Sequence, residues 1–180
     1  VLTDINTGKV KALVSYPGYD ANQINNVSYY ASLINNSSSP LYNRATQQTL
    51  APGSTFKPIS AIAGLEEGVI DADTYITDYV EYTKVVPHAN CWNSAGHGTI
   101  NVEQAIEYSC NYFFYEVGYR LGSKDNTTEL NDSTGLALLA KYAKMFGLDS
   151  VSGLELPETT PRISDESVVR SAIGQATHNY

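Results

Sequence analysis

The stretch "APGSTFKPIS", residues 51–60, places a serine and a lysine three positions apart between two prolines. Apolar residues recur at helical spacing just after it, and Gly68 suits the end of such a helix. We therefore expect Ser54 and Lys57 to lie at the N-terminal end of a helix. Residues i and i+3 share a helix face, with Cβ atoms roughly 5–6 Å apart. The stretch thus predicts a hydroxyl and an amine that can meet on the first turn.

Two interpretations of this pair are open from the stretch alone. An unactivated serine hydroxyl is a weak nucleophile, and a neighbouring amine can take its proton if burial or nearby positive charge lowers the amine's pKa. The helix N-terminus also supplies free N–H groups for an oxyanion. The structural alternative is that Ser54 or Thr55 caps the helix and Lys57 is a solvated side chain. Ser-x-x-Lys occurs often by chance, so the flanking sequence has to decide.

Composition excludes several classes of function. The 180 residues are 42% hydrophobic and 17% charged, which is typical of a globular domain rather than of a disordered chain. The net charge is −8, and the eleven Lys and Arg residues are scattered. Nucleic acid and anionic membrane surfaces are therefore excluded as expected partners. The sequence has no apolar stretch of about 18 residues and no secretory leader pattern at its start, so we expect nothing within these residues to anchor or export the chain.

The first residues predict a β-hairpin over about residues 1–16. Valine-rich runs flank "NTGK", and Gly8 can take the positive φ that a hairpin turn requires. Because the pattern begins at the first residue, we expect the native polypeptide to extend further on the N-terminal side. Residues 20–50 are polar and lack a clear period, which indicates a long surface segment with a short helix.

The rest of the chain, about residues 50–180, is expected to be a mostly helical subdomain. Asn101 and Gln104 resemble a capping box at a second helix start. Further helical faces end at Gly122 and Gly147, with a polar loop over 122–135 between them, and Ser164 suits one more helix start. The sequence thus predicts an α+β fold of one hairpin and four helical segments. Two strands alone make a marginal sheet.

Longer strings around the serine carry a resemblance to a known family. "NRAT" and "LAPGSTFKP", followed by "SCN", resemble the serine transpeptidases of cell-wall synthesis, the penicillin-binding proteins. Ser54 and Lys57 match the first motif of the family, and Ser109 and Asn111 match its Ser-x-Asn motif fifty-five residues later. "DINTGKVKALVSYPGYDAN", "GHGTINVEQAIEYSCNYFFYEVG" and the "IGQ" near the end are similar to the family as well. The resemblance implies a β-lactamase/transpeptidase-like fold and covers nearly the whole chain.

The resemblance also implies a role for each motif residue. Ser54 becomes the nucleophile that attacks the penultimate D-Ala carbonyl of a peptidoglycan stem peptide, and Lys57 becomes its base. Ser109 relays a proton to the departing amine, and Asn111 bonds the substrate amide and holds Lys57. β-Lactam antibiotics imitate D-Ala-D-Ala and acylate Ser54, and no cofactor is required. Without the first motif, Ser109 and Asn111 would be explained as turn residues between two helices.

The third motif of the family, Lys followed by Thr or Ser and then Gly, is absent from residues 1–180. The lysines that follow Asn111 are Lys124, Lys141 and Lys144, and none is followed by that pair. The family places this motif on a strand beside the nucleophile. We therefore expect a partial transpeptidase domain without the remaining sheet strands, with negligible turnover of its own.

A second cluster of functional residues follows the pattern His88-x2-Cys91-x5-His97. Imidazole and thiolate are preferred zinc ligands, and close spacing in a loop fits a small structural site. The sequence nominates no fourth ligand. The alternatives are that His97 belongs to the family's "GHG" turn, that His88 is a loop residue, and that Cys91 is a buried thiol. A disulfide between Cys91 and Cys110 is a further alternative.

Other functions of the same superfamily stay open from the sequence. A serine β-lactamase needs a positioned base for a deacylating water, and no acidic residue is identified as one. A β-lactam sensor domain or a catalytically silent structural module is the alternative of a different class. The "GHG" and "SCN" context resembles monofunctional class B proteins. This implies a parent anchored through an upstream segment on the outer face of a bacterial cytoplasmic membrane, with cell-wall synthesis proteins as partners.

Overall fold

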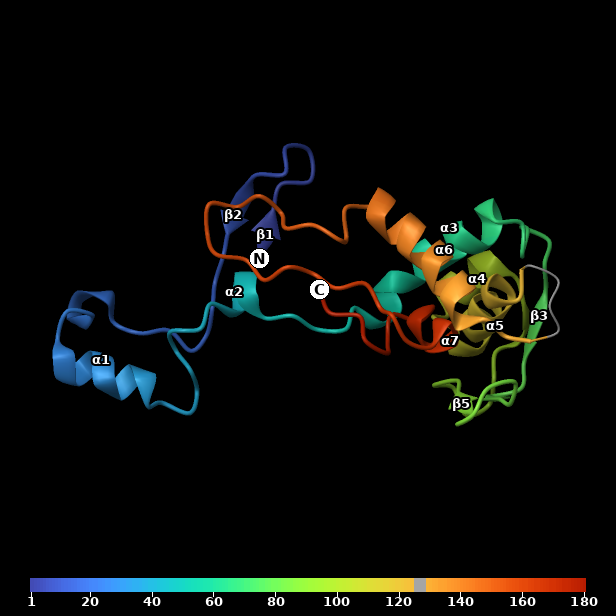
Figure 1. Cartoon of the computed structure of the whole chain (residues 1–180), viewed down its shortest axis with the longest axis horizontal. Helices are drawn as coiled ribbons and strands as arrows, with labels where there is room; N and C mark the ends of the chain where they lie inside the picture. Colours follow the sequence, from blue (N-terminus) through green and yellow to red (C-terminus); the bar gives the residue numbers. More distant parts are fainter. Residues whose placement is uncertain (125–128) are drawn as a thin grey trace. The chain divides into compact units, whose positions relative to one another are not determined.

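The computed structural model describes residues 1–124 and 129–180 and divides the chain into two units (Figure 1). The first unit holds residues 1–49 and 151–159, and the second holds residues 50–150 and 160–180. Part of the polar loop predicted over 122–135 lies outside the described residues. Within the described ranges, no helix combines the length and the apolar character needed to cross a membrane.

The first unit opens with the predicted hairpin. Strands β1 (Leu2–Thr3) and β2 (Val10–Ala12) pair antiparallel, with Leu2 opposite Ala12. The turn between them places Gly8 at φ +68° and closes with a hydrogen bond from Gly8 N to the Asp4 carbonyl at 2.8 Å. A residue with a Cβ is disfavoured at this φ, which explains why the "NTGK" sequence makes the turn here.

The polar segment that follows contains short helices, each started by a capping side chain. They are the 3-10 helix η1 (Ala21–Gln23), α1 (Val27–Ile34) and α2 (Arg44–Gln47). The side chain of Asn26 accepts hydrogen bonds from the first-turn N–H groups of α1, and Asn43 does the same for α2. The asparagines that obscure the helical period in the sequence therefore serve as N-caps.

The second unit is a helical core with α5 (Asn111–Gly122) at its centre. α5 packs against α3 (Lys57–Glu66), α6 (Asp132–Met145) and α7 (Val168–Ser171), and α4 (Val102–Glu107) precedes it (Figure 1). The side chains of Phe113, Phe114, Val117 and Leu121 are fully buried. Burial of side chains of this size contributes about 1.5–3 kcal/mol each, which makes α5 the element that holds the others in place.

Two small antiparallel pairs lie beside the N-terminal end of α5. β3 (Ile76–Asp78) pairs with β6 (Gly98–Ile100), and β4 (Glu81–Tyr82) pairs with β5 (Ala89–Asn90). β3, β4 and β5 all contact α5. This arrangement brings the loop that carries the predicted metal ligands next to the predicted Ser-x-Asn motif.

Three predicted helix starts compare differently with the structure. The capping box at Asn101 and Gln104 is confirmed. α6 begins at Asp132, because Asn131 accepts a hydrogen bond from the Thr134 N–H, so the helix extends further than its apolar face indicated. The helix start at Ser164 was wrong: α7 begins at Val168, and its N-cap is Ser167.

Candidate active site

The serine of the opening stretch lies on a short 3-10 helix, η2 (Gly53–Phe56), that leads directly into α3. Neither Ser54 nor Thr55 caps the helix, because the N-cap residue of η2 is Pro52 and no side chain makes a capping bond there or at the start of α3. The Thr55 hydroxyl instead donates to the Pro52 carbonyl at 2.7 Å. Ser54 is exposed, and its hydroxyl bonds to no other described residue. It is thus free to meet a substrate.

Lys57, one turn further on, is almost completely buried, with 2% of its surface exposed. Its ammonium nitrogen donates to the main-chain oxygen of Ser109 at 2.6 Å, to the Ser109 hydroxyl at 3.0 Å and to the Asn111 side-chain oxygen at 2.7 Å. The nitrogen also lies 5.8 Å from the centre of the Phe114 ring. Three of the four predicted catalytic residues are therefore in direct contact, and the solvated-lysine interpretation is wrong.

Burial changes the acid-base behaviour of this lysine. Removal from water disfavours the ammonium form and lowers the pKa of Lys57 from 10.5 to about 8, although the nearby Cys110 and Cys91 act in the opposite direction. An amine with a pKa near 8 is a free base in part at neutral pH. Lys57 therefore has the property that a general base for a neighbouring hydroxyl needs.

Ser109 lies in the turn between α4 and α5 and Asn111 is the first residue of α5, close to where the structural alternative expected them, and both residues contact the lysine. Ser109 has φ +52°, a left-handed conformation that non-glycine residues adopt rarely and at a free-energy cost of order 1–3 kcal/mol. In this conformation its carbonyl accepts from Lys57 and from the indole Nε1 of Trp92, which lies 3.0 Å away. Since the Ser109 hydroxyl also accepts from Lys57, the strained residue supplies two acceptors, its carbonyl and its hydroxyl, for one ammonium group.

Trp92 is a residue of this site that the sequence did not reveal. Its side chain is 64% exposed, yet its indole N–H is used, and its ring packs edge-on against His97 with the centroids 5.3 Å apart. The one signal in the sequence was that the only tryptophan of the chain directly follows Cys91.

A cluster of side chains that could bind a metal ion includes Cys110, the residue between Ser109 and Asn111. Asp78, Cys91, His97 and Cys110 place one ligand atom each within 4.8 Å of one another. His97 Nδ1 lies 2.7 Å from the Asp78 carboxylate, and the two sulfur atoms are 3.9 Å apart. His97 Nε2 is buried and has no partner among the described residues. Cys110 joins this cluster to the site, because it stands between Ser109 and Asn111.

The donor set fits a tetrahedral zinc ion. Two thiolates at the usual Zn–S distance of 2.3 Å lie about 3.8 Å apart in a tetrahedron, close to the observed separation. Burial acts to raise the pKa of Asp78, but its hydrogen bonds with His97 and Cys91 outweigh this and lower it. The hydrogen bond between the two thiols lowers the pKa of Cys91 and raises that of Cys110. The group therefore holds negative charge that a cation would balance.

The composition of the cluster differs from the set read from the sequence. Cys91 and His97 belong to it, whereas His88 lies outside it, with its Nδ1 2.9 Å from Glu81 across the β4–β5 pair. Both cysteines are free thiols, so the disulfide alternative does not describe this structure. Asp78 could not be identified from spacing, because only the pairing of β3 with β6 brings it to His97.

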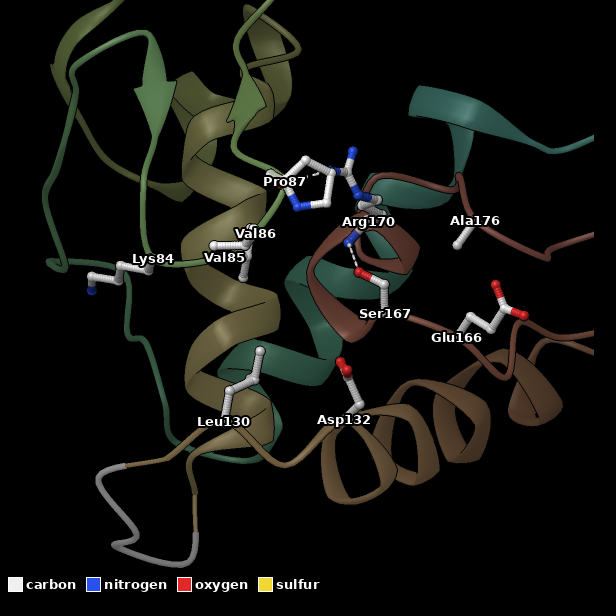
Figure 2. A pocket seen from close by; sticks show the side chains of 10 residues that line it. All are labelled: Lys84, Val85, Val86, Pro87, Leu130, Asp132, Glu166, Ser167, Arg170 and Ala176. Atoms are coloured by element: carbon white, nitrogen blue, oxygen red, sulfur yellow. Dashed lines mark hydrogen bonds between the residues drawn. The ribbon is translucent and has the colours of Figure 1, made fainter.

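A cavity of about 520 Å³ lies elsewhere in the same unit (Figure 2). Val85, Val86 and Leu130 form its apolar lining, and Arg170 extends beside Pro87, to whose carbonyl it donates at 2.8 Å. None of the predicted catalytic or metal-ligating residues lines it. The cavity is therefore separate from the chemistry around Ser54.

Comparison with known proteins agrees with this geometry. A family model described as "Penicillin binding protein transpeptidase domain" matches residues 1–179. The chain is 35% identical over 163 residues to the peptidoglycan D,D-transpeptidase MrdA of Escherichia coli K12, covering 88% of this chain and 24% of that protein. The chain thus spans about a quarter of the length of this relative.

Solved structures show the same fold. Penicillin-binding protein A from Mycobacterium tuberculosis, as an imipenem acyl-enzyme complex, superposes with a TM-score of 0.81 at 28% identity, covering 99% of this chain and 41% of that one. A peptidoglycan synthase complex, studied for the coordination of polymerization and crosslinking, contains a chain with a TM-score of 0.82 at 28% identity, covering 98% of this chain and 31% of that one. The motifs, the fold and the family match agree: the chain belongs to the penicillin-binding protein transpeptidase domain family.

Proposed function

We propose that this chain carries the serine, base and Ser-x-Asn residues of a peptidoglycan D,D-transpeptidase of the monofunctional class B type. The observation that carries the proposal is the buried Lys57 ammonium, held by Ser109 and Asn111 one turn from an exposed Ser54. A surface cap does not require a buried lysine with three charge-assisted bonds. A nucleophile requires a base of this kind.

The reaction follows from these positions. Ser54 Oγ bonds to the penultimate D-Ala carbonyl carbon of a stem peptide as its proton passes to the neutral Lys57 amine. Collapse of the tetrahedral intermediate breaks the bond to the terminal D-Ala, and the Ser109 hydroxyl, which contacts the Lys57 nitrogen at 3.0 Å, relays the proton to that leaving amine. The amine of a second stem peptide then attacks the acyl-enzyme carbonyl carbon, its proton passes to Ser54 Oγ by way of the neutral Lys57 amine as the ester bond breaks, and the cross-linking amide forms.

A β-lactam tests this proposal, because its strained amide acylates the same serine and leaves a stable adduct. We expect a fluorescent penicillin to label the protein, as its host produces it, once per chain at Ser54, with the site located by peptide mass spectrometry. Ser54→Ala abolishes labelling, whereas Ser28→Ala, an exposed serine on α1, leaves it unchanged. Labelling that persists in Ser54→Ala would refute the proposal.

Residues 1–180 by themselves are proposed to acylate slowly, because they contain no Lys-Thr-Gly or Lys-Ser-Gly sequence to bind the substrate carboxylate. The second-order acylation rate constant of the isolated chain measures this. A value equal to that of the protein from its host would contradict it. We also propose that the protein works on the outer face of the bacterial cytoplasmic membrane, with cell-wall synthesis proteins as partners. The relationship to a peptidoglycan synthase complex supports this placement.

We further propose that a structural zinc ion binds Asp78, Cys91, His97 and Cys110. These four side chains would hold the ion, which would supply structural coordination and balance their negative charge. Asp78 and Cys91 come from the strand region, and Cys110 lies between two catalytic residues. The ligands thus connect β3 to the Ser109–Asn111 turn.

Elemental analysis of protein purified without a histidine tag tests the zinc proposal. We expect about one equivalent of zinc, retained in His88→Gln and lost in Cys91→Ser. Cobalt substitution gives an independent measurement, because thiolate-bound cobalt absorbs in the near ultraviolet. Metal well below one equivalent together with no cobalt–thiolate absorption would contradict the site.

A further inference from the structure

The turn that presents Ser54 is held by the last residues of the described chain. Gly53 N donates to the Gly174 carbonyl at 2.9 Å, and the buried Ser60 hydroxyl of α3 donates to the Ala172 carbonyl at 2.7 Å. Gly174 has φ +72°, and a Cβ there would overlap the Gly53 carbonyl oxygen. The residue before the nucleophile is thus in backbone contact with a segment more than a hundred residues away.

His178 extends this contact to Phe56, the last residue of η2. Its ring packs on Phe56 with the centroids 4.4 Å apart, and both side chains are buried, at 3% and 1% exposure. The Tyr180 ring is stacked with the Phe56 ring with the centroids 6.3 Å apart, and its main chain pairs with Leu50 through two hydrogen bonds of 2.9 and 3.0 Å. Phe56 lies between Ser54 and Lys57 in the sequence, so this aromatic contact holds the segment that carries both residues.

The hydrogen bonds of His178 fix its protonation state. The Ser164 main-chain N–H points at Nδ1 from 3.1 Å, and the Tyr180 hydroxyl lies 3.0 Å from the same atom. Because a main-chain N–H can only donate, Nδ1 is an unprotonated acceptor, and the Tyr180 hydroxyl can donate to it as well. Nε2 then carries the hydrogen and donates to the Ser171 carbonyl at 3.1 Å. The imidazole thus joins the segment at Ser164, the end of α7 and the Phe56 side chain, and it does so as one neutral tautomer.

We propose that neutral His178 is a positioning residue of the acylation reaction, holding Phe56, and with it the Gly53–Ser54 turn, in register with Lys57. The proposal rests on the function proposed above for Ser54. Protonation of His178 would place a hydrogen on Nδ1 against the Ser164 N–H. This would break the bond that anchors the ring and loosen the nucleophile turn.

Among the residues that the structure describes, no charged side chain contacts His178 to stabilise its protonated form. Burial lowers its pKa from the ordinary 6.5, although the bond to the Ser171 carbonyl acts the other way. Within the described ranges, the one titratable side chain in contact with His178 is Tyr180, whose hydroxyl lies 3.0 Å from Nδ1 and whose pKa burial raises to about 12. Arg162 pairs with the exposed Asp165, Arg170 of α7 points to Pro87 (Figure 2), and Lys57 of α3 points to Ser109.

The test compares variants that cannot be protonated. His178→Gln keeps a donor for the Ser171 carbonyl, His178→Phe keeps only the ring, and His88→Gln is the control at an exposed histidine. The acylation rate constant with fluorescent penicillin is measured from pH 5 to 9. Below the pKa of Lys57, protonation of its free base alone lowers the acylation rate constant tenfold for each pH unit of acidification. We expect a steeper fall in the wild type and His88→Gln below the pKa of His178, and no steepening in His178→Gln or His178→Phe.

A second measurement distinguishes failure of the function proposed for Ser54 from failure of the positioning role proposed for His178. Hydrogen–deuterium exchange gives the protection factors of the peptide that contains Gly53–Phe56, and these factors correct for the intrinsic effect of pH. We expect protection to fall in acid in the wild type and to stay constant in His178→Gln. A wild-type Ser54 that is never labelled refutes the proposed function, and exchange alone then tests the positioning role. Equal acid profiles of wild type and His178→Gln in rate and in exchange refute that role.

Discussion

The ammonium nitrogen of Lys57 lies 2.6 Å from the main-chain oxygen of Ser109 and 3.0 Å from its hydroxyl. One residue thus contacts the base through two oxygen atoms, and the left-handed backbone at Ser109 makes both available. Since Asn111 supplies the third acceptor, the position of the base depends on the turn between α4 and α5 as much as on α3 itself.

The first prediction is that acylation of Ser54 requires an amine base at position 57. Lys57→Arg keeps the positive charge, but a guanidinium with a pKa above 12 cannot act as a base at neutral pH. We expect the acylation rate constant of Ser54 to fall by roughly 10²–10⁴-fold, the usual contribution of general base catalysis. Lys144→Arg, the same change at an exposed lysine of α6, leaves the rate unchanged. A Lys57→Arg protein that acylates normally would show that another group takes the proton.

Lys57 also predicts how folding stability depends on pH. Its pKa is lower in the folded protein, about 8, than the ordinary 10.5, so between these values the unfolded chain binds a proton that the folded protein does not. Stability from this group therefore rises as the pH rises through that window, and below pH 8 the group destabilises the fold by about 3 kcal/mol. Urea denaturation of wild type and Lys57→Met between pH 7 and 10.5 measures it. The free energy of unfolding of the wild type, relative to that of Lys57→Met, should increase as the pH rises from 8 to 10.5.

Asn111 sets the electrostatics of the base through its side-chain oxygen at 2.7 Å. Asn111→Asp replaces a neutral acceptor with a carboxylate, which stabilises the ammonium form and raises the pKa of Lys57 by about one unit or more. We expect the pH midpoint of Ser54 acylation to move up accordingly, with a lower rate at pH 7. Asn131→Asp, at the N-cap of α6, provides the same substitution remote from Lys57 in sequence. An unchanged midpoint in Asn111→Asp would mean that another group controls the profile.

Trp92 donates to the Ser109 carbonyl at 3.0 Å from an exposed position. Trp92→Phe keeps an aromatic ring beside His97 and removes the donor. A hydrogen bond of this kind is worth about 1 kcal/mol, so we expect acylation to slow by roughly fivefold. The melting temperature should change little, because most of the ring is already in water. A large loss of melting temperature with normal acylation would assign Trp92 to the fold instead.

Glu116 of α5 predicts a second pH effect. Its carboxylate accepts from Tyr82 and Lys84 at 2.8 Å and from Arg120 at 2.9 Å. Burial acts to raise the pKa of Glu116, but these bonds outweigh it and lower the pKa below 4.5. The stabilisation is complete above pH 4.5 and is lost as the pH falls through the folded-state pKa.

The substitution Glu116→Gln isolates that contribution. We expect a loss of about 1–2 kcal/mol at pH 7, since Lys84 and Arg120 lose a charged partner but remain partly in water, and a weaker acid dependence than in the wild type. Glu107→Gln, at the exposed end of α4, is the matched control and should cost less than about 0.5 kcal/mol. Identical acid unfolding of Glu116→Gln and wild type would contradict the assignment.

The sequence predicted what depends on local spacing. The hairpin follows from a turn sequence around Gly8, and Ser54 and Lys57 follow from a motif one helix turn long. The structure brings the Lys57 ammonium to Asn111, as the resemblance implied, and also to Ser109. These features needed no knowledge of which distant segments come together, apart from the family's own separation between the two motifs.

What the sequence missed depends on tertiary contacts. Asp78 reaches His97 only through the pairing of β3 with β6, and His178 reaches Phe56 only once the last residues pack on α3. The helix start at Ser164 failed for a related reason. Its hydroxyl donates to the Glu166 carbonyl and contacts Thr177 rather than capping the helix, and Ser167 takes the cap with φ +46°. A single sequence does not reveal which hydroxyl such a network will use.

The saturation of the Lys57 ammonium has a consequence for inhibitor design. All three of its hydrogens are directed at acceptors of the protein, so an anionic group on an incoming ligand would have to displace Ser109 or Asn111 to reach it. The Ser54 hydroxyl, exposed and without a partner among the described residues, presents no such competition. Electrophiles that capture the oxygen atom should therefore outperform reversible ligands that rely on pairing with the lysine.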